Sequence, residues 1–444
     1  MGITAEHTVP APRLKVWNWH ARPGAVTRLT PPFLPMTVAS EAASLRSGTT
    51  VFALPAGQRW VAQHQHSGYE FARSFEDVAA NQPVRALTKW RHRHTFRDSV
   101  EDAGSTVLLD AVSTPTPATL LTPAFAYRQR QLVGDIAFAQ SLPASAPLVI
   151  ALTGSSGLVG THLRAQLTTL GHTVIPLVRH TAGPGERQWD PDNPHPDLLE
   201  GVDAVIHPAG ESIMGRFTDA KKRRIWDSRV APTRKLAALA AESGVRTFIS
   251  ASAVGYYGTE AGGSPHAEDA PVGAGFLAEV CQAWEEAARV EGLRTVQIRT
   301  GLALSGAGGL LPVLKASVSA GLGARFGSGD FWMSWVSLDD LTDTYVRALL
   351  DHTVSGPVNA TAAQPVTNAE MSATLAEVLR RPDVLPIPTF GPKLLLGSEG
   401  AAELALADQR VDAAVARQRG WVQRYPTLRS ALDHELGRED LLEA

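Results

Sequence analysis

Three glycines spaced three apart, Gly154, Gly157 and Gly160, form the pattern in this 444-residue sequence that points most directly to chemistry. They follow the short β-branched run 148–153 and precede an amphipathic segment, an order that predicts a strand, a turn and a helix. The first glycine permits a tight turn, the second lets the backbone approach a pyrophosphate, and the third lets the helix pack close to the strand. Unpaired N–H groups and the positive dipole end of the helix attract phosphates. We therefore expect a dinucleotide bound by Gly154, Ser155, Gly157, Leu158, Val159 and Gly160.

A cation at the end of the next predicted strand indicates which dinucleotide is bound. Arg179 follows the run 172–178, which reads as the second strand of a βαβ unit. An acidic residue at this position binds the ribose 2′-hydroxyl of NAD, whereas a cation accommodates the 2′-phosphate of NADP. The sequence therefore predicts NADP, with NAD as the second choice. The alternative is that Arg179 is only a solvated charge at a strand end.

Small and hydroxyl-bearing residues follow two later predicted strands, 202–207 and 247–252. Ala209 and Gly210 form a small-residue turn after the first, where the backbone can come close to a cofactor at the carboxyl edge of the sheet. Ser252 ends the second, where its hydroxyl is placed to bind a substrate carbonyl or hydroxyl, although serines at such places more commonly cap turns. Further cofactor contacts are expected from Ser250 and Arg299.

Three strings in this part of the chain carry a resemblance: Thr-Gly-Ser-Ser-Gly-Leu-Val-Gly at 153–160, and the strings 203–211 and 250–258. Together they resemble the extended or atypical short-chain dehydrogenase/reductase superfamily. Residues 148–436 are most similar to its subgroup of nucleoside-diphosphate-sugar epimerases, with support from the strings 226–229, 276–285, 298–301 and 333–340. The resemblance implies a Rossmann fold, a nicotinamide cofactor and a small C-terminal extension.

The resemblance also implies catalytic positions, and here the sequence departs from the superfamily. Typical members use Ser, Tyr and Lys with an upstream Asn, and the tyrosine transfers the proton. Ser252 matches the serine, and Arg229 stands where the Asn would be. The Tyr-x-x-x-Lys motif is absent, because in the register that we favour Leu277 replaces the tyrosine and Cys281 the lysine. The other register gives Gly275 and Glu279. A standard keto-reductase mechanism therefore lacks its acid.

Other side chains are candidates for the missing groups. Tyr257, or its neighbour Tyr256, is a candidate acid, although packing against the core or the cofactor is the more common role of such residues. Cys281 is a nucleophile only if it is exposed and deprotonated, whereas a lone cysteine on a helix is usually a small buried hydrophobe. Candidate bases are Glu211, Glu268 and Asp269.

The first 140 residues differ from the rest in composition and hydrophobic pattern, and they predict a separate α+β domain with a helix-grip arrangement. Short alternating runs predict antiparallel strands at 48–54, 58–63, 86–96 and 105–112. Helices are predicted at 12–20 and 123–139, the longer one offering to a core Phe125, Leu132, Ile136 and Phe138. The strings 28–33, 89–96 and 127–132 resemble the START-like ligand-binding domain of the polyketide-cyclase superfamily. This resemblance implies an apolar cavity between sheet and helix, and a small lipophilic ligand or a regulatory role.

Two His-x-His pairs raise the question of a metal in this domain. His64 and His66, and likewise His92 and His94, would lie on one face of a strand, because strand side chains repeat every two residues. No carboxylate or thiolate accompanies them at a recognisable spacing, so we expect polar surface histidines and no metal.

Composition excludes several classes of protein. With 41 basic and 44 acidic residues the net charge is -3, and no Lys/Arg block suggests binding to nucleic acid or to an anionic membrane. The single cysteine excludes an intrachain disulfide and fits a reducing compartment. No apolar run is long enough to span a bilayer, and residues 1–15 lack the order of a signal peptide. We therefore expect a cytoplasmic protein that acts on a small molecule.

The sequence thus predicts an α/β protein built of several parts. We expect a START-like domain at 1–140, a linker at 141–147, a doubly wound NADP-binding Rossmann domain with a substrate lobe at 148–380, and a C-terminal extension at 381–444. The expected function is an NADP-dependent oxidoreductase or epimerase (isomerase) acting on a small molecule such as a nucleotide sugar. The alternative is a non-catalytic NADP-binding sensor with a lipophilic ligand in the N-terminal cavity.

Overall fold

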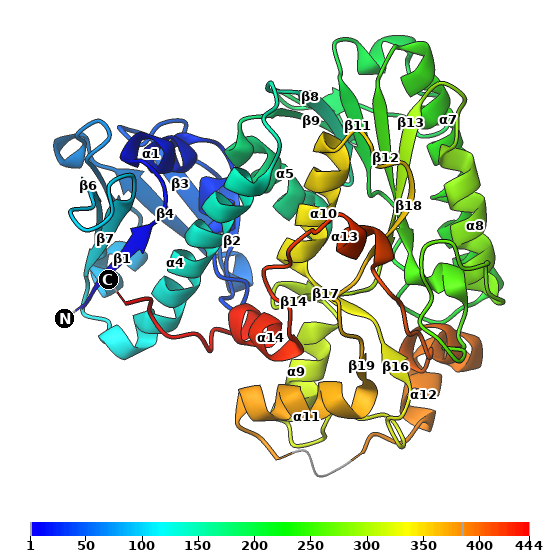
Figure 1. Cartoon of the computed structure of the whole chain (residues 1–444). Helices are drawn as coiled ribbons and strands as arrows, with labels where there is room; N and C mark the ends of the chain where they lie inside the picture. The colour runs from blue at the N-terminus through cyan, green and yellow to red at the C-terminus, as the bar shows by residue number, and fades with distance from the viewer. Residues whose placement is uncertain (1, 383–385, 444) are drawn as a thin grey trace. The chain divides into compact units, whose positions relative to one another are not determined.

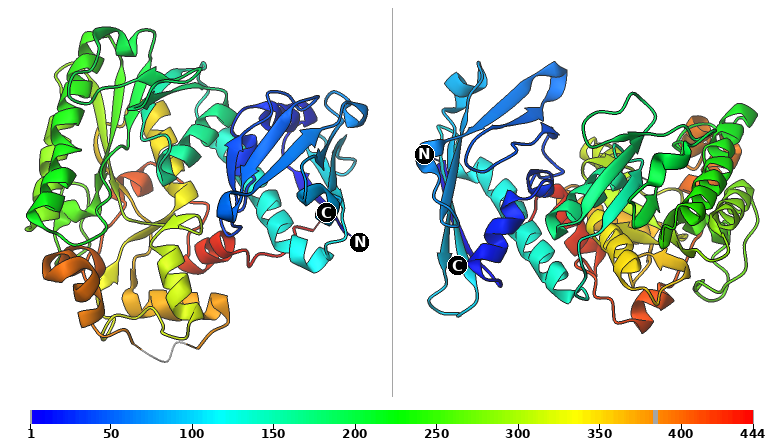
Figure 2. Two further views of the ribbon diagram at one scale, coloured as in Figure 1. Left: turned by 180° about the vertical axis from the view of Figure 1, so that it is seen from behind. Right: turned by 90° about the horizontal axis from the view of Figure 1, so that it is seen from above.

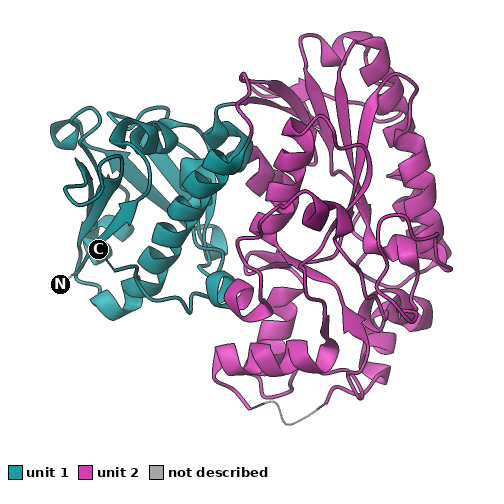
Figure 3. Ribbon diagram, viewed as in Figure 1, with its two compact units in different colours: residues 1–142, 165–171, 433–444 teal, residues 143–164, 172–432 magenta. Residues whose placement is uncertain are grey.

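The computed structural model describes residues 2–382 and 386–443. Contacts divide the chain into two compact units (Figure 3). Unit 1 comprises residues 1–142, 165–171 and 433–444, and unit 2 comprises residues 143–164 and 172–432.

Unit 1 is built on a seven-stranded antiparallel sheet (Figure 1). The strands lie in the order β1 (Gly2–Val9), β7 (Thr106–Ser113), β6 (Arg91–Asp98), β5 (Ser74–Ala79), β4 (Arg59–His64), β3 (Thr49–Ala53) and β2 (Thr37–Ser40). Its helices are α1 (Arg13–Ala21), α2 (Ala25–Arg28), α3 (Val84–Thr88) and the 24-residue α4 (Ala118–Ser141). An antiparallel sheet with a long closing helix is the arrangement expected for this part of the chain; its START-like character stays a prediction.

The core of unit 1 lies between one face of the sheet and helices α1 and α4. The four α4 side chains expected in a core are all buried: Phe125, Leu132, Ile136 and Phe138. Leu132 and Ile136 pack with Trp17 of α1 and Phe96 of β6 in one apolar cluster. The long helix therefore covers the inner face of the sheet.

Three strands of unit 1, β1, β2 and β5, escaped the sequence analysis. Strand β5 carries Glu76 and Asp77 in its middle, so its charges hide the alternation that marks a strand. The strand expected at 86–96 begins only at Arg91, because helix α3 occupies residues 84–88. The structure corrects these predictions.

Unit 2 contains a seven-stranded sheet in which all neighbouring strands are parallel. The order is β10 (Arg187–Gln188), β9 (Thr173–Val178), β8 (Val149–Thr153), β11 (Ala204–His207), β12 (Thr247–Ala253), β13 (Arg294–Thr300) and β18 (Gly356–Ala360). In Figure 1, helices α7 (Val230–Glu242) and α8 (Phe276–Ala288) lie on the opposite side of this sheet from α10 (Leu338–Leu350). The strand order reverses between β8 and β11, which is where doubly wound sheets bind their ligands.

Small elements form a lobe beside the parallel sheet (Figure 2). They are strands β14 (Leu302–Ser305), β15 (Gly308–Gly309), β16 (Trp332–Met333), β17 (Trp335–Ser337) and β19 (Val366–Thr367), and helices α9 (Leu311–Ser319), α11 (Asn368–Leu379) and α12 (Phe390–Gly400). Helix α13 (Ala414–Gln418) packs against β18, and α14 (Leu428–Leu436) follows it in the chain. Arg424 binds Asp343 of α10 through two hydrogen bonds of 2.6 and 2.7 Å. The segment before α14 is therefore fixed to α10 by a largely buried ion pair.

Two consecutive helices follow β11 in unit 2. They are α6 (Asp219–Asp227) and α7, which meet at Ser228 and Arg229. Among the described residues, none of the helices has the length and apolar character needed to cross a membrane.

Candidate functional site

The glycine-rich turn joins β8 to helix α5 (Leu158–Leu170), as its spacing predicted. Gly154 has a φ of +59°, and a Cβ there would lie 3.2 Å from the backbone of Ala209. A Cβ on Gly160 would lie 2.1 Å from the carbonyl oxygen of Gly154. Both positions therefore require glycine, the first for the turn and the second for the close approach of helix and strand.

The middle of the turn is open to a ligand. Ser156 and Gly157 are exposed, while Ser155, Leu158 and Val159 are partly buried. The turn is held from within, because the Gly157 N–H donates to the Gly154 carbonyl at 2.9 Å and the Thr161 hydroxyl donates to the Ser155 carbonyl at 3.1 Å. An open, preformed turn at a helix N-terminus fits the pyrophosphate of a dinucleotide.

The neighbouring turn after β11 is fixed by a buried histidine that the sequence analysis missed. His207 lies 2.7 Å from the Thr153 hydroxyl and 3.0 Å from the Thr233 hydroxyl. The Ala209 N–H donates to the same Thr153 hydroxyl at 3.3 Å. Burial lowers the pKa of His207 to about 3, so the imidazole is neutral and positions Ala209 and Gly210. The sequence signal that could have identified His207 is a polar residue at the end of an apolar strand.

Arg179 lies just beyond the carboxyl end of β9 and is exposed. Strand β9 pairs with β8 so that Leu177 stands opposite Thr153, which puts Arg179 at the level of the glycine-rich turn. Among the described residues it makes no hydrogen bond or ion pair, and its guanidinium is therefore available to a ligand phosphate.

Ser252 sits in the interior, at the carboxyl end of β12. Its hydroxyl donates to Glu285 Oε1 at 2.7 Å. Arg299 binds the same carboxylate through Nε at 2.8 Å and Nη2 at 2.9 Å. Arg299, which was expected at the cofactor, is thus buried in a bidentate ion pair. Ser250, also expected there, is fully buried, and its hydroxyl donates to the Ala251 carbonyl.

Tyr257 belongs to the same buried network. Its hydroxyl donates to Asn359 Oδ1 at 2.7 Å and accepts from Arg299 Nη1 at 2.8 Å. Burial raises the pKa of Tyr257 to about 12, the opposite of what a proton-transferring tyrosine needs at neutral pH. Tyr256 packs its ring against the Arg299 guanidinium at 3.5 Å. Both tyrosines therefore stabilise the loop after β12.

Helix α8 places beside this loop Leu277 and Cys281, the two positions at which the chain differs from the superfamily. A Cβ on Gly255 would lie 3.4 Å from Leu277 and 3.9 Å from the Cys281 sulfur. This placement favours the register in which Leu277 and Cys281 replace the tyrosine and the lysine. Cys281 is buried, and burial raises the pKa of its thiol to about 11, so it stays protonated and is a poor nucleophile.

Arg229 begins α7 and uses its donors on the protein. It donates to the carbonyls of Glu211 at 2.9 Å and Ile225 at 3.1 Å, and its guanidinium lies 5.0 Å from the Trp284 ring. A Cβ on Gly210 would lie 2.9 Å from it. Arg229 therefore supports the turn after β11 rather than reaching into open space.

The candidate bases lie in different surroundings. Glu211 accepts from Lys221 Nζ at 3.0 Å, which lowers its pKa. Glu268 is buried, which raises its pKa, and its Oε1 accepts from the Asn359 N–H at 3.0 Å. Asp269 is exposed. Of the three, Glu268 joins the network that contains Ser252, because its backbone carbonyl accepts from Arg299 Nη1 at 3.0 Å.

Comparisons with known proteins agree with this geometry. Residues 150–361 match the model of the NAD dependent epimerase/dehydratase family, and residues 387–435 match a domain of unknown function, DUF1731. An epimerase family protein of Mycobacterium bovis is 40% identical over 297 residues, which are 65% of this chain and 98% of that protein.

Two solved structures are similar to the chain. The crystal structure of the nucleoside-diphosphate sugar epimerase from Corynebacterium glutamicum has 48% identity and a TM-score of 0.88, covering 99% of this chain and 91% of that one. Human epimerase family protein SDR39U1, solved with NADPH, has 28% identity and a TM-score of 0.61, covering 65% and 99%. The bacterial structure thus matches both units, whereas the human one matches about two thirds of the chain.

Proposed function

Because the chain belongs to the NAD dependent epimerase/dehydratase family, we propose that it binds NADP(H) and uses it to oxidise, reduce or epimerise a small molecule. The preferred substrate class is a nucleotide sugar, which is the substrate class named for the Corynebacterium glutamicum relative.

The choice of NADP rests on Arg179, a free cation beside the glycine-rich turn. The two required glycines, Gly154 and Gly160, fit a pyrophosphate, and the Arg179 guanidinium supplies the charge that a ribose 2′-phosphate needs. The human relative was solved with NADPH, which supports the same choice.

The chain's own side chains position the substrate. A bound nicotinamide supplies the hydride chemistry. Ser252 donates its hydrogen to Glu285, so its oxygen lone pairs remain to accept a hydrogen bond from a substrate hydroxyl. Arg299 fixes the Glu285 carboxylate through two hydrogen bonds, which orients the serine hydroxyl. Arg229 acts indirectly, by holding the turn at Gly210.

Titration with NADPH and NADH, followed by tryptophan fluorescence, tests the cofactor proposal. Arg179→Ala removes one charge-assisted contact, so NADPH affinity falls about 10- to 100-fold while NADH affinity stays unchanged. Arg246→Ala is the matched control. Arg246 is exposed and lies just before β12, at the amino ends of the strands, whereas the glycine-rich turn lies at their carboxyl ends. Absence of binding by either nucleotide would overturn the proposal, and equal loss in both variants would remove Arg179 from the site.

A second function is favoured by one observation: apolar Leu277 and buried, protonated Cys281 stand where the superfamily places its tyrosine and lysine. In that case the chain is a sensor that binds NADP without turnover and takes a lipophilic ligand in unit 1.

Turnover of NADPH in the presence of carbonyl compounds or nucleotide sugars separates the two functions. An enzyme oxidises NADPH or interconverts the sugar, and Ser252→Ala lowers the rate about 100-fold without changing NADPH affinity. Ser243→Ala, at the exposed end of α7, serves as the control. A rate for Ser252→Ala equal to that of the wild type would exclude a role for Ser252, and binding without any turnover would favour the sensor.

A further inference from the structure

Unit 1 buries a cluster of histidines and carboxylates under its helices. Cross-strand pairs lie on the same face of a sheet. Asp77 of β5 pairs with His92 of β6, and His94 of β6 pairs with Asp110 of β7. His64 of β4 stands opposite Asp77 on the other side. Pairing across four strands thus adds Asp77, Asp110 and His64 to the His92/His94 pair on one face, although no spacing in the sequence connects them with it.

This face is covered by apolar side chains from the helices and the sheet. Phe125 of α4 meets the His92 ring at 5.4 Å between centroids, and Phe75 stacks on His94 at 4.0 Å. The side chains of His92 and His94 are 6% and 4% exposed, respectively. Water therefore has little access to the polar atoms of the cluster.

Asp110 holds both imidazoles from one side. Its Oδ1 lies 2.8 Å from His92 Nε2 and 2.8 Å from His94 Nδ1. His92 Nε2 forms a hydrogen bond to this Asp110 oxygen, and His94 Nδ1 lies at the same distance from it. One nitrogen of each ring is therefore turned toward Asp110.

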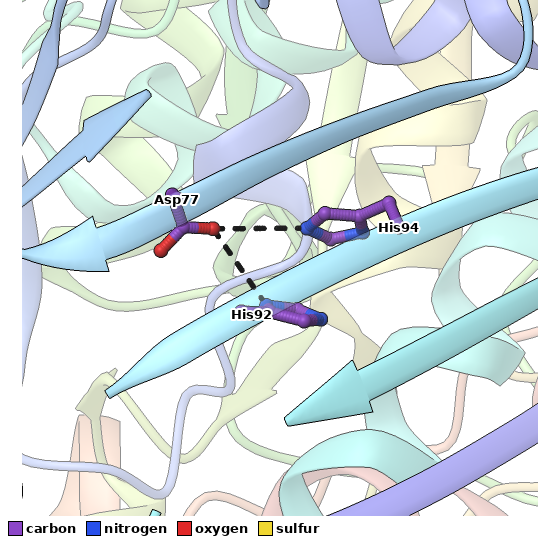
Figure 4. A group of neighbouring side chains, drawn as sticks. All are labelled: Asp77, His92 and His94. Carbon is purple, nitrogen blue, oxygen red and sulfur yellow. Dashed lines mark ion pairs between the residues drawn. The ribbon is translucent and has the colours of Figure 1, made fainter. Parts of the chain in front are cut away.

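The other two ring nitrogens converge on a second carboxylate (Figure 4). His92 Nδ1 and His94 Nε2 each lie 3.8 Å from Asp77 Oδ2, and these three atoms lie within 4.8 Å of one another. The nitrogen of each ring that is turned away from Asp110 therefore faces the Asp77 carboxylate. Two ring nitrogens and a carboxylate oxygen this close together, in a site shielded from water, have the arrangement of ligand atoms around a cation.

We propose that Asp77, His92 and His94 bind a divalent first-row transition-metal ion, with Asp110 orienting both imidazoles. Two imidazoles and one carboxylate suit Zn²⁺ or Fe²⁺ and leave at least one coordination position open. The 3.8 Å separations exceed the edge of about 3.4 Å for a tetrahedron with bonds of about 2.1 Å, so the three side chains must move closer together when they bind the ion. A carboxylate behind a ligating histidine is the usual outer-shell partner.

A further buried imidazole supports a ligand at this face. His7 of β1 is 1% exposed, and neither ring nitrogen has a hydrogen-bond partner among the described residues. It lies on the inner face of the sheet, opposite Leu108, close enough to Asp110 for the two side chains to interact electrostatically. A buried imidazole without partners is costly unless a bound group completes its hydrogen bonds. The open coordination position is where such a group would attach.

The test uses the untagged full-length protein, stripped with a chelator and then titrated with Zn²⁺ in competition with a chromogenic chelator. The wild type binds one equivalent per chain with micromolar or tighter affinity, and Co²⁺ in its place gives the absorption bands of a low-symmetry N/O site. Asp77→Asn and His92→Asn lower the affinity by more than the roughly 10- to 100-fold expected for Asp110→Asn. His66→Ala is the matched control, because His66 is an exposed histidine of the same unit.

Two results overturn the proposal. One is the absence of stoichiometric metal binding by the wild type, with nitrogen NMR shifts showing an imidazolium at His94, so that a proton is the cation. The other is affinity that is unchanged in Asp77→Asn but lost in His66→Ala. Should the variants fail to fold, X-ray absorption of the wild type loaded with Zn²⁺ decides, because the proposal requires two imidazole nitrogens among the ligands.

Discussion

Two buried polar clusters, one in each unit, differ in how their donors and acceptors are matched. In unit 2, Glu285 accepts from Ser252 and from two nitrogens of Arg299, and Arg299 donates onward to Tyr257. Both oxygens of the Glu285 carboxylate thus accept hydrogen bonds, and its charge is paired with that of Arg299. In unit 1, Asp77 faces two imidazole nitrogens at 3.8 Å, with a second carboxylate behind them. At 3.8 Å the contacts of Asp77 are longer than hydrogen bonds, so this carboxylate is not matched as Glu285 is.

The difference separates a network whose carboxylate is already paired within the chain from a cluster whose carboxylate is not. The matched network fixes the loop that carries Tyr257, a candidate acid in the sequence analysis, and orients the Ser252 hydroxyl. An unmatched cluster is complete only with a cation. Hydrogen-bond matching therefore distinguishes the two roles better than residue type does, because both clusters contain groups that are common in active sites.

The largest effect is expected from breaking the matched network. Glu285→Ala leaves the Arg299 guanidinium buried without its carboxylate, so the free energy of unfolding falls by about 3 to 5 kcal/mol. Glu286→Ala, one position along the same helix and exposed, changes it by about 0.5 kcal/mol or less. Urea unfolding of both variants measures the difference. Equal stability of the two variants would mean that the ion pair contributes nothing, and the comparison between the clusters would fail.

The cofactor turn could be predicted from the sequence because its determinants are local. Gly154 and Gly160 lie within seven residues, and the turn that they require depends on the adjoining strand and helix alone. The same reading located β9 and the exposed Arg179 beside it. The cofactor site could therefore be predicted from the spacing of neighbouring residues alone.

The cluster of histidines and carboxylates in unit 1 and the matched network in unit 2 could not be predicted in this way. Asp77 meets His92 only because β5 and β6 pair in one register, and the charges of β5 concealed the strand itself. Glu285 did leave a signal, since it lies on the buried stripe of α8 that also contains Cys281 and Ala288. A carboxylate on such a stripe needs a buried partner, yet the sequence does not show that the partner is Arg299.

A smaller effect, and a sharper one, concerns His207, a buried histidine whose partners are hydroxyls rather than carboxylates. Burial lowers its pKa to about 3 in the folded protein, against about 6.5 in the unfolded chain. Because the unfolded chain binds the proton more tightly, the stability contribution of His207 is complete above pH 6.5 and falls as the pH drops toward 3. Between pH 7 and pH 5 the loss is about 2 kcal/mol.

His207→Gln keeps hydrogen-bonding capacity without a titrating group, so its stability falls by about 2 kcal/mol less than that of the wild type over this range. His195→Gln is the control, because the His195 side chain is 74% exposed and this variant should follow the wild type. Urea unfolding at each pH gives the three curves. Parallel curves for His207→Gln and the wild type would show that His207 takes up a proton inside the folded protein. The contrast between hydroxyl-matched and carboxylate-facing histidines would then have to be abandoned.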